Sequence, residues 1–194
     1  MTVYKHYEKE LLHIHIPKTG GTSVTAAVES YGGLSSFLKK RAVPQCGNVP
    51  PQHMDIVHTR KFFPKKTIPS FAVIRDPWQR TVSEYVWQFN TTDWQGLDKW
   101  VKYAFQKVIH YKMLNHFLPQ YKFIDDDVKL FRYEDFNSMI KYVGEQLGFE
   151  KFECNHKEQV RKIYKTPSID VLDKEAMAVW NNLYQKDIEL HQSL

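Results

Sequence analysis

The first segment that could do chemistry is a short loop rich in glycine and hydroxyl side chains, residues 17–23, with the sequence Pro-Lys-Thr-Gly-Gly-Thr-Ser. It follows the apolar run 11–16, which predicts a strand, and precedes apolar residues at helical spacing, which predict a helix near 22–31. Glycines let backbone N–H groups turn toward one centre, and a helix N-terminus favours negative charge. The loop therefore predicts a binding site for a phosphate or sulfate group. Its predicted site residues are Lys18, Thr19, Gly20, Gly21, Thr22 and Ser23.

A second candidate site follows the apolar run 71–75, which predicts a buried strand. Asp76 is a good helix N-cap and Pro77 suits the first helical position, so a helix is expected near 77–90. Arg75 then lies at the carboxyl end of a strand, where open α/β sheets bind ligands. Ser83 stands eight residues after Arg75, on a different helical face from the apolar stripe. Together these residues predict a second anion-binding position.

The two motifs together resemble those of sulfotransferases that use 3′-phosphoadenosine-5′-phosphosulfate (PAPS). The loop is not a Walker A sequence, because Lys18 precedes both glycines, whereas the Walker lysine follows the second one. It is similar to the 5′-phosphosulfate loop of these sulfotransferases, and Arg75 with Ser83 is similar to their 3′-phosphate motif. The resemblance implies that PAPS is the cofactor and that Lys18 stabilises charge on the leaving phosphate. It spans residues 11 to 190, but only the two phosphate motifs are specific.

Transfer to an alcohol also benefits from a general base, and the resemblance implies a histidine between the two motifs. Residues 54–58 predict a strand that ends at His58, which makes His58 the first candidate. A structural histidine that bonds a backbone group explains His58 equally well. His53 and Glu84 are reserve candidates, and the histidines inside the first strand are expected to be buried.

A basic segment near the carboxyl terminus could close over the nucleotide, as it does in the enzymes that this chain resembles. Lys165 is its best candidate, because the following Thr166-Pro167 indicates a loop. A solvated helix face explains the other basic residues of the segment more simply. These other residues are Lys157, Arg161 and Lys162.

Strands near 11–16, 54–58, 71–75 and 128–132 alternate with helices near 22–31, 77–90, 97–108, 135–147 and 173–188. This order predicts one α/β domain over residues 1–194, a P-loop-like three-layer sandwich whose mainly parallel central sheet is flanked by helices. The irregular segment 32–52, with a basic cluster at 39–41, is expected to line the acceptor cleft.

Composition narrows the class of partner. The chain has 194 residues, a formal net charge of +5 and a pI near 9.0, which favours anionic partners. No basic tail or RNA-binding signature supports nucleic acid. No apolar run is long enough to span a membrane and no signal-peptide pattern is present, so a cytoplasmic location is expected. Cys46, His53 and His58 match no familiar zinc spacing, so no metal site is predicted.

The predicted function is therefore transfer of a sulfuryl group from PAPS to an acceptor hydroxyl, with a carbohydrate as the favoured acceptor. One alternative is a P-loop kinase or NTPase, which would need an acidic magnesium ligand after a strand. Asp76 stands at such a position, but a helix cap explains it better. The other alternative is a non-catalytic module that binds anionic polymers.

Overall fold

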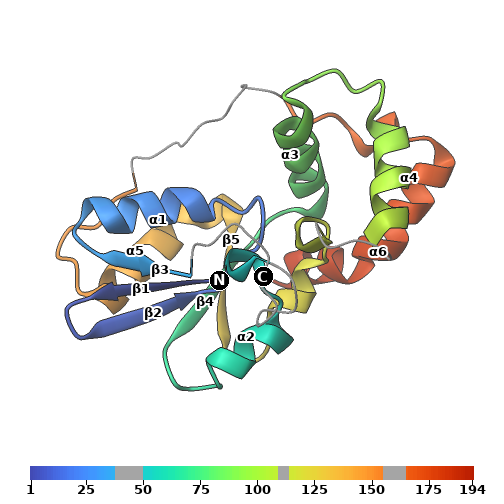
Figure 1. Cartoon of the computed structure of the whole chain (residues 1–194). Helices are drawn as coiled ribbons and strands as arrows, with labels where there is room; N and C mark the ends of the chain where they lie inside the picture. The colour runs from blue at the N-terminus through green and yellow to red at the C-terminus, as the bar shows by residue number, and fades with distance from the viewer. Residues whose placement is uncertain (38–49, 109–113, 155–164) are drawn as a thin grey trace.

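A five-stranded sheet forms the centre of the computed structural model, which describes residues 1–37, 50–108, 114–154 and 165–194 (Figure 1). The strand order is β3-β1-β2-β4-β5. Strands β2, β4 and β5 run parallel, whereas β1 is antiparallel to both of its neighbours. The strands are β1 (Thr2–His6), β2 (Lys9–His13), β3 (Leu34–Ser36), β4 (Ser70–Ile74) and β5 (Val128–Arg132).

Helices pack against both faces of the sheet, because successive strand residues point to opposite sides. Leu11 and Val73 face a core shared with α1 and α5, whereas Leu12 and Ile74 face a core reached by α2 and the end of α6. Figure 1 shows α1 and α5 on one side of the strands and α2 on the other. The α-helices are α1 (Gly21–Ser30), α2 (Ile56–Phe62), α3 (Pro77–Phe89), α4 (Leu97–Val108), α5 (Phe136–Leu147) and α6 (Lys174–Ser193).

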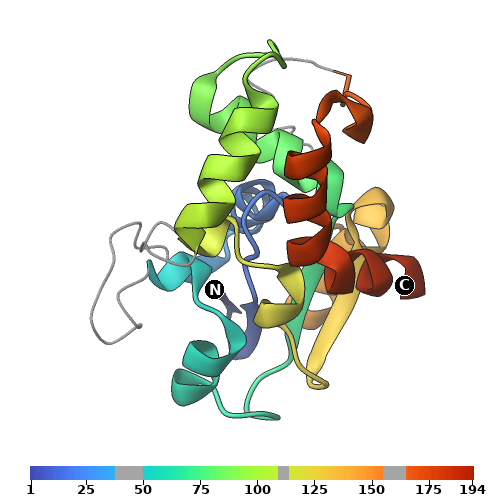
Figure 2. The same cartoon turned by 90° about the vertical axis from the view of Figure 1, so that its right-hand side faces the viewer.

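A third core lies away from the sheet and joins α3, α4 and α6. Trp100 of α4 and Trp180 of α6 are among its buried side chains, and α4 and α6 run side by side in Figure 2. Short 3-10 helices link these helices to the sheet. They are η2 (Pro51–His53), η3 (Leu114–His116), η4 (Gln120–Phe123), η5 (Tyr133–Asp135) and η6 (Ile169–Val171).

The structure confirms the predicted strands 71–75 and 128–132 and all five predicted helices, but not the strand at 54–58. That segment contains α2 instead, because the Asp55 side chain caps a helix by accepting from the backbone N–H of His58 (2.8 Å). The sheet is mixed: β2, β4 and β5 pair in parallel as predicted, whereas β1 pairs antiparallel with both β2 and β3. The turn of the β1–β2 hairpin contains no glycine that would have indicated it in the sequence. Tyr7 occupies the turn and adopts a φ of 50°.

Part of the sequence prediction falls outside the described residues. In the segment 32–52, residues 34–36 form β3, whereas 38–49, with the basic cluster 39–41 and Cys46, lie outside. The same is true of 155–164, which contains Lys157, Arg161 and Lys162. No helix in the part of the chain that the structure describes is long and apolar enough to cross a bilayer.

Candidate anion-binding site at the carboxyl edge of the sheet

The two predicted motifs meet at one edge of the sheet. Parallel pairing of β2 with β4 and of β4 with β5 brings the three carboxyl ends together. Arg75 follows β4, and its guanidinium carbon lies 4.3 Å from the ring centre of Tyr133, which follows β5. Nη1 of Arg75 donates to the Lys18 carbonyl at 3.2 Å. The arginine of one motif thus contacts the loop of the other directly.

The loop after β2 is held in a curled conformation by its own backbone. Lys18 and Gly20 both have a positive φ, 68° and 86° respectively. Lys18 is not a glycine, so its left-handed conformation is uncommon and costs on the order of 1–3 kcal/mol. The buried Thr19 hydroxyl donates to the Ile16 carbonyl at 2.8 Å and braces the curl. Thr19 therefore faces the loop interior with its side chain, and only its backbone N–H is left for a ligand.

Helix α1 begins without a capping side chain. Its N-cap is Gly20, and its first turn contains no acidic residue. Most other α-helices of the described chain begin at an aspartate whose carboxylate accepts a backbone N–H of the first turn. These helices and caps are α2 with Asp55, α3 with Asp76, α5 with Asp135 and α6 with Asp173. No side chain therefore caps the first N–H groups of α1; that of Ser23 donates to the Gly20 carbonyl at 3.0 Å, and those of Gly21 and Thr22 suit an external anion.

Both loop glycines are required by their surroundings. A Cβ on Gly20 would lie 3.1 Å from the Phe136 ring and would also face the positive φ. A Cβ on Gly21 would lie 2.3 Å from Nε2 of His15, far inside van der Waals contact. The loop is thus packed against side chains from beneath and opens on its other side, where Thr22 is exposed.

Arg75 is fixed in place yet keeps one unused donor. The Gln120 side chain accepts from the Arg75 N–H (3.0 Å) and donates to the Arg75 carbonyl (2.8 Å). The backbone N–H of Gln120 in turn donates to the buried Asp187 carboxylate at 2.7 Å. Nε of Arg75 is buried and has no hydrogen-bond partner among the described residues. A buried guanidinium nitrogen without a partner fits a phosphate oxygen as its missing acceptor.

Helix α3 presents Ser83 toward the same region. Ser83 is half-buried, and Trp87 lies one turn further along the same helical face. Nζ of Lys18 lies 5.2 Å from the centre of the Trp87 ring. This face of α3 is therefore next to the loop, and it brings Ser83 to the site that Lys18 and Arg75 share.

Arg80 ties the loop to η3, and the sequence analysis missed it. The side chain is buried, with Nε donating to the Pro17 carbonyl (3.0 Å) and Nη2 to the carbonyls of His116 (2.8 Å) and Leu118 (3.1 Å). Arg80 lies on the face of α3 that carries Ser83 and not on the apolar stripe, and its partners lie far away in sequence.

Four histidine rings line up from the sheet to α3. His13 stacks on His15 (5.3 Å between ring centres), His15 meets the edge of His53 (4.9 Å), and His53 meets His116 (4.9 Å). Burial lowers the pKa of His13 to about 3 and holds the pKa values of His15 and His53 well below their ordinary range. Three of the four rings are therefore neutral near pH 7. His13 and His15 are buried, which confirms the expectation for the histidines of the first predicted strand.

The remaining candidates are placed less centrally. His58 stands in the first turn of α2, where its Nδ1 lies 2.8 Å from the Asp55 carboxylate. Lys165 is exposed. It lies two residues before Pro167, whose carbonyl accepts from Trp78 Nε1 at 2.7 Å, so its segment runs past the start of α3.

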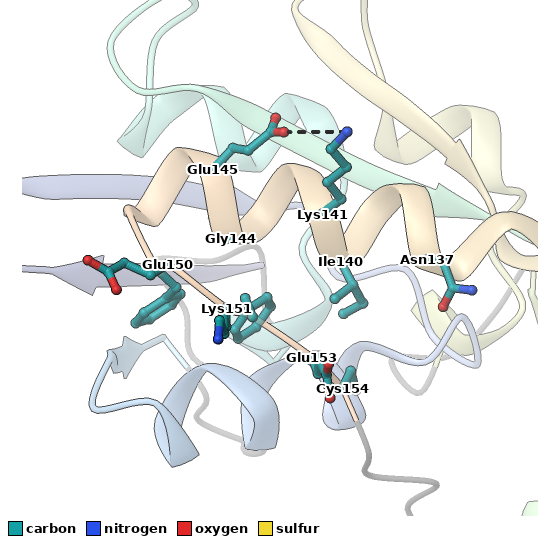
Figure 3. A pocket seen from close by; sticks show the side chains of 11 residues that line it. Asn137, Ile140, Lys141, Gly144, Glu145, Glu150, Lys151, Glu153 and Cys154 are labelled. Carbon is teal, nitrogen blue, oxygen red and sulfur yellow. Dashed lines mark ion pairs between the residues drawn. The ribbon is translucent and has the colours of Figure 1, made fainter.

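A pocket of about 640 Å³ lies elsewhere, between α5 and the segment 149–154 (Figure 3). Lys141 and Glu145 form an ion pair on its rim at 4.0 Å. None of the sequence-predicted site residues lines it in the described chain. Its nearest link to the loop is Cys154, whose Sγ donates to the Ser23 carbonyl at 3.5 Å.

The geometry describes an α/β protein with two candidate anion-binding motifs at the carboxyl edge of its parallel strands. Residues 2–192 match the family model described as the Sulfotransferase family. The chain therefore belongs to the sulfotransferase family. No curated protein and no solved structure matches the chain.

Proposed function

We propose that this protein is a PAPS-dependent enzyme that transfers a sulfuryl group to an acceptor hydroxyl, with a carbohydrate as the acceptor class. The observation that carries the proposal is the meeting of two different anion sites at one sheet edge. One site is the uncapped start of α1 beside Lys18, and the other is Arg75 with its unpartnered Nε. PAPS carries phosphate groups on both sides of its ribose, so a two-site arrangement suits it. Helices on both faces of the sheet support a P-loop-like three-layer architecture.

Each motif would hold one end of the cofactor. Lys18 and the backbone N–H groups of residues 20–23 would hold the 5′-phosphosulfate, with the Thr22 and Ser23 hydroxyls as further donors. Arg75 and Ser83 would hold the 3′-phosphate. Lys165 would cover the nucleotide, because its segment is anchored to α3 through Trp78.

Bound PAPS would supply an activated sulfuryl group. The protein's own contribution is alignment and electrostatic stabilisation, as in phosphoryl transfer. Lys18 and the first N–H groups of α1 are fixed before any ligand arrives, so they stabilise negative charge on the leaving phosphate without reorganisation. The +5 charge of the chain supports an acceptor that carries carboxylate or sulfate groups.

His58 is a candidate for the general base in this proposal. The Asp55 carboxylate beside Nδ1 orients the ring and leaves Nε2 available to accept a proton. About 30% of the His58 side chain is exposed, so an acceptor hydroxyl can reach it.

Calorimetric titration with 3′-phosphoadenosine-5′-phosphate (PAP), adenosine 5′-phosphate and ATP tests the cofactor assignment. We expect PAP to bind most tightly. Arg75→Ala should weaken PAP by roughly ten- to hundredfold, since hydrogen bonds to charged groups contribute about 1.5–3 kcal/mol. Adenosine 5′-phosphate should be little affected. Lys129→Ala removes one exposed positive charge from β5 and serves as the matched control.

The other outcomes identify the competing functions. Tighter binding of ATP than of PAP, with a magnesium requirement for turnover, would make the protein a P-loop kinase or NTPase. If none of the three nucleotides bound, the protein would be a non-catalytic module for anionic polymers.

A further inference from the structure

A carboxylate–imidazole pair lies beside the candidate site and was not predicted as a pair. Nδ1 of His116, in η3, lies 3.0 Å from Oε2 of Glu84, on α3. Burial raises the pKa of Glu84, but the interaction with His116, the charge of Lys18 and a hydrogen bond from Gln88 outweigh it and lower the pKa. Glu84 is therefore an ionised carboxylate that can only accept, so Nδ1 of His116 carries a proton. When the ring carries that proton alone, Nε2 bears the lone pair.

The pair is next to Lys18. The His116 ring stacks on Trp87 with 5.3 Å between ring centres, and the same Trp87 ring carries Lys18 Nζ at 5.2 Å. Trp87 thus contacts both the lysine and the imidazole, so the distance from Lys18 Nζ to the His116 ring centre cannot exceed the sum of these two distances. The charge of Lys18 also acts on Glu84.

Arg80 fixes the pair relative to the loop. One buried guanidinium donates to the Pro17 carbonyl at the start of the loop and to the His116 carbonyl in η3. A shift of either segment would break a charge-assisted hydrogen bond in the interior, which is costly. Arg80 is therefore a positioning residue that sets the distance between the imidazole and the phosphate loop.

Of the four histidines whose rings line up between the sheet and α3, His116 is the best suited to take up a proton. His53 also has a free Nε2, because its Nδ1 donates to the His15 carbonyl at 3.1 Å, but burial holds its pKa well below the ordinary range. About 25% of the His116 side chain is exposed, and its carboxylate partner stabilises an imidazolium. In the described chain, the charged or titratable groups around His116 are Glu84 and Arg80 from α3, His53 from η2, and His15 and Lys18 from the segment after β2.

We infer that His116, oriented by Glu84, is the group that accepts the proton of the acceptor hydroxyl; the inference rests on the proposed sulfuryl transfer. The acceptor oxygen forms a bond to sulfur while the bond between sulfur and the bridging phosphate oxygen breaks. The electron pair of the broken bond stays on the phosphate, beside Lys18. The hydroxyl proton moves to Nε2 of His116. Sulfur keeps its oxidation state, and no further reactant is needed.

The experiment measures PAP release from PAPS with water alone and with dextran, chondroitin or N-acetylheparosan as hydroxyl probes, together with PAP affinity by calorimetry. His116→Gln should lower kcat by roughly 10²–10⁴ while leaving the Kd for PAP within about twofold, because base catalysis contributes that range to the rate. It should also remove the rise of kcat with pH. Glu84→Gln should lower kcat by less and leave PAP affinity unchanged. His191→Gln is the matched control, because the His191 ring also pairs with a carboxylate, that of Glu134, at 3.3 Å.

The outcomes separate this inference from the proposed function. If PAP does not bind the wild type, or binds without any PAPS turnover, the proposed function fails and the inference with it. If PAP binds and PAPS turns over, but His116→Gln keeps kcat within threefold, the inference alone is wrong. A large loss in His58→Gln with none in His116→Gln would assign the base to His58. Thermal unfolding of each variant checks that it is folded.

Discussion

The units β2–α1 and β4–α3 share one local architecture, a strand that runs into a helix at the same sheet edge, but they present their donors differently. In β2–α1 the helix starts at a glycine with no capping side chain, so backbone N–H groups face the site. In β4–α3 the Asp76 side chain accepts from the N–H of Gln79 at 2.8 Å, so the helix start is already satisfied. There the donors are side chains, Arg75 before the helix and Ser83 within it.

On the proposed function, this difference would set what each unit recognises. Backbone donors around a curled loop would enclose a small tetrahedral group from several sides. Arg75 and Ser83, eight residues apart, would instead hold a second group at a set distance from that loop.

Of the changes that test this comparison, the largest effect is expected from removing Lys18, the one charged side chain in the loop of the β2–α1 unit. Lys18→Ala should lower the rate of PAP release from PAPS by about 10²–10³, the usual consequence of losing a donor that stabilises transition-state charge. PAP affinity should fall far less, because the backbone N–H groups remain. Lys129→Ala is again the charge-matched control. Full activity in Lys18→Ala would show that charge on the leaving phosphate is stabilised elsewhere.

Gly21→Ala tests the same unit through its backbone. The new Cβ would fall 2.3 Å from Nε2 of the buried His15, so either the loop or the ring must move. Overpacking of this kind typically lowers the free energy of unfolding by 1–3 kcal/mol, and we expect the shifted loop to lose PAP affinity as well. Urea denaturation and calorimetry measure the two effects. Gly96→Ala is the control, since its Cβ would meet only the Tyr85 hydroxyl at 3.4 Å.

The smallest effect is expected in the capped unit. Asp76→Ala removes the cap of α3 and should lower the free energy of unfolding by about 1 kcal/mol. Asp76 faces the helix and not the ligand, so PAP affinity should change little. If Asp76→Ala weakened the free energy of PAP binding by more than it lowered the free energy of unfolding, the start of α3 would take part in binding. The two units would then differ less than their hydrogen bonds indicate.

The sequence alone predicts the helices and the two phosphate motifs because their signals are local. Asp76-Pro77 indicates the start of α3. A lysine and two glycines after an apolar run indicate the loop at 17–23. The prediction of a strand at 54–58 was wrong because Asp55 is the N-cap of α2. The apolar residues on both sides of Asp55 resemble a strand and make this cap hard to recognise. Arg80 and the Glu84–His116 pair were missed because their contacts join residues that are distant along the chain; Glu84 and His116 are 32 positions apart. Only the tertiary structure brings such groups together.

The buried histidine row makes the stability of the fold depend on acidity. His13, His15 and His53 have lowered pKa values in the native state, about 3 for His13, whereas an unfolded histidine titrates near 6.5. Between these values the unfolded chain binds more protons, so the free energy of unfolding should fall as the pH drops below 6.5, by up to about 1.4 kcal/mol per pH unit for each histidine. Urea denaturation at pH 7.5, 6 and 5 measures the slope, which His13→Gln should reduce. Mild acid is therefore expected to destabilise this protein through protonation of its buried imidazoles.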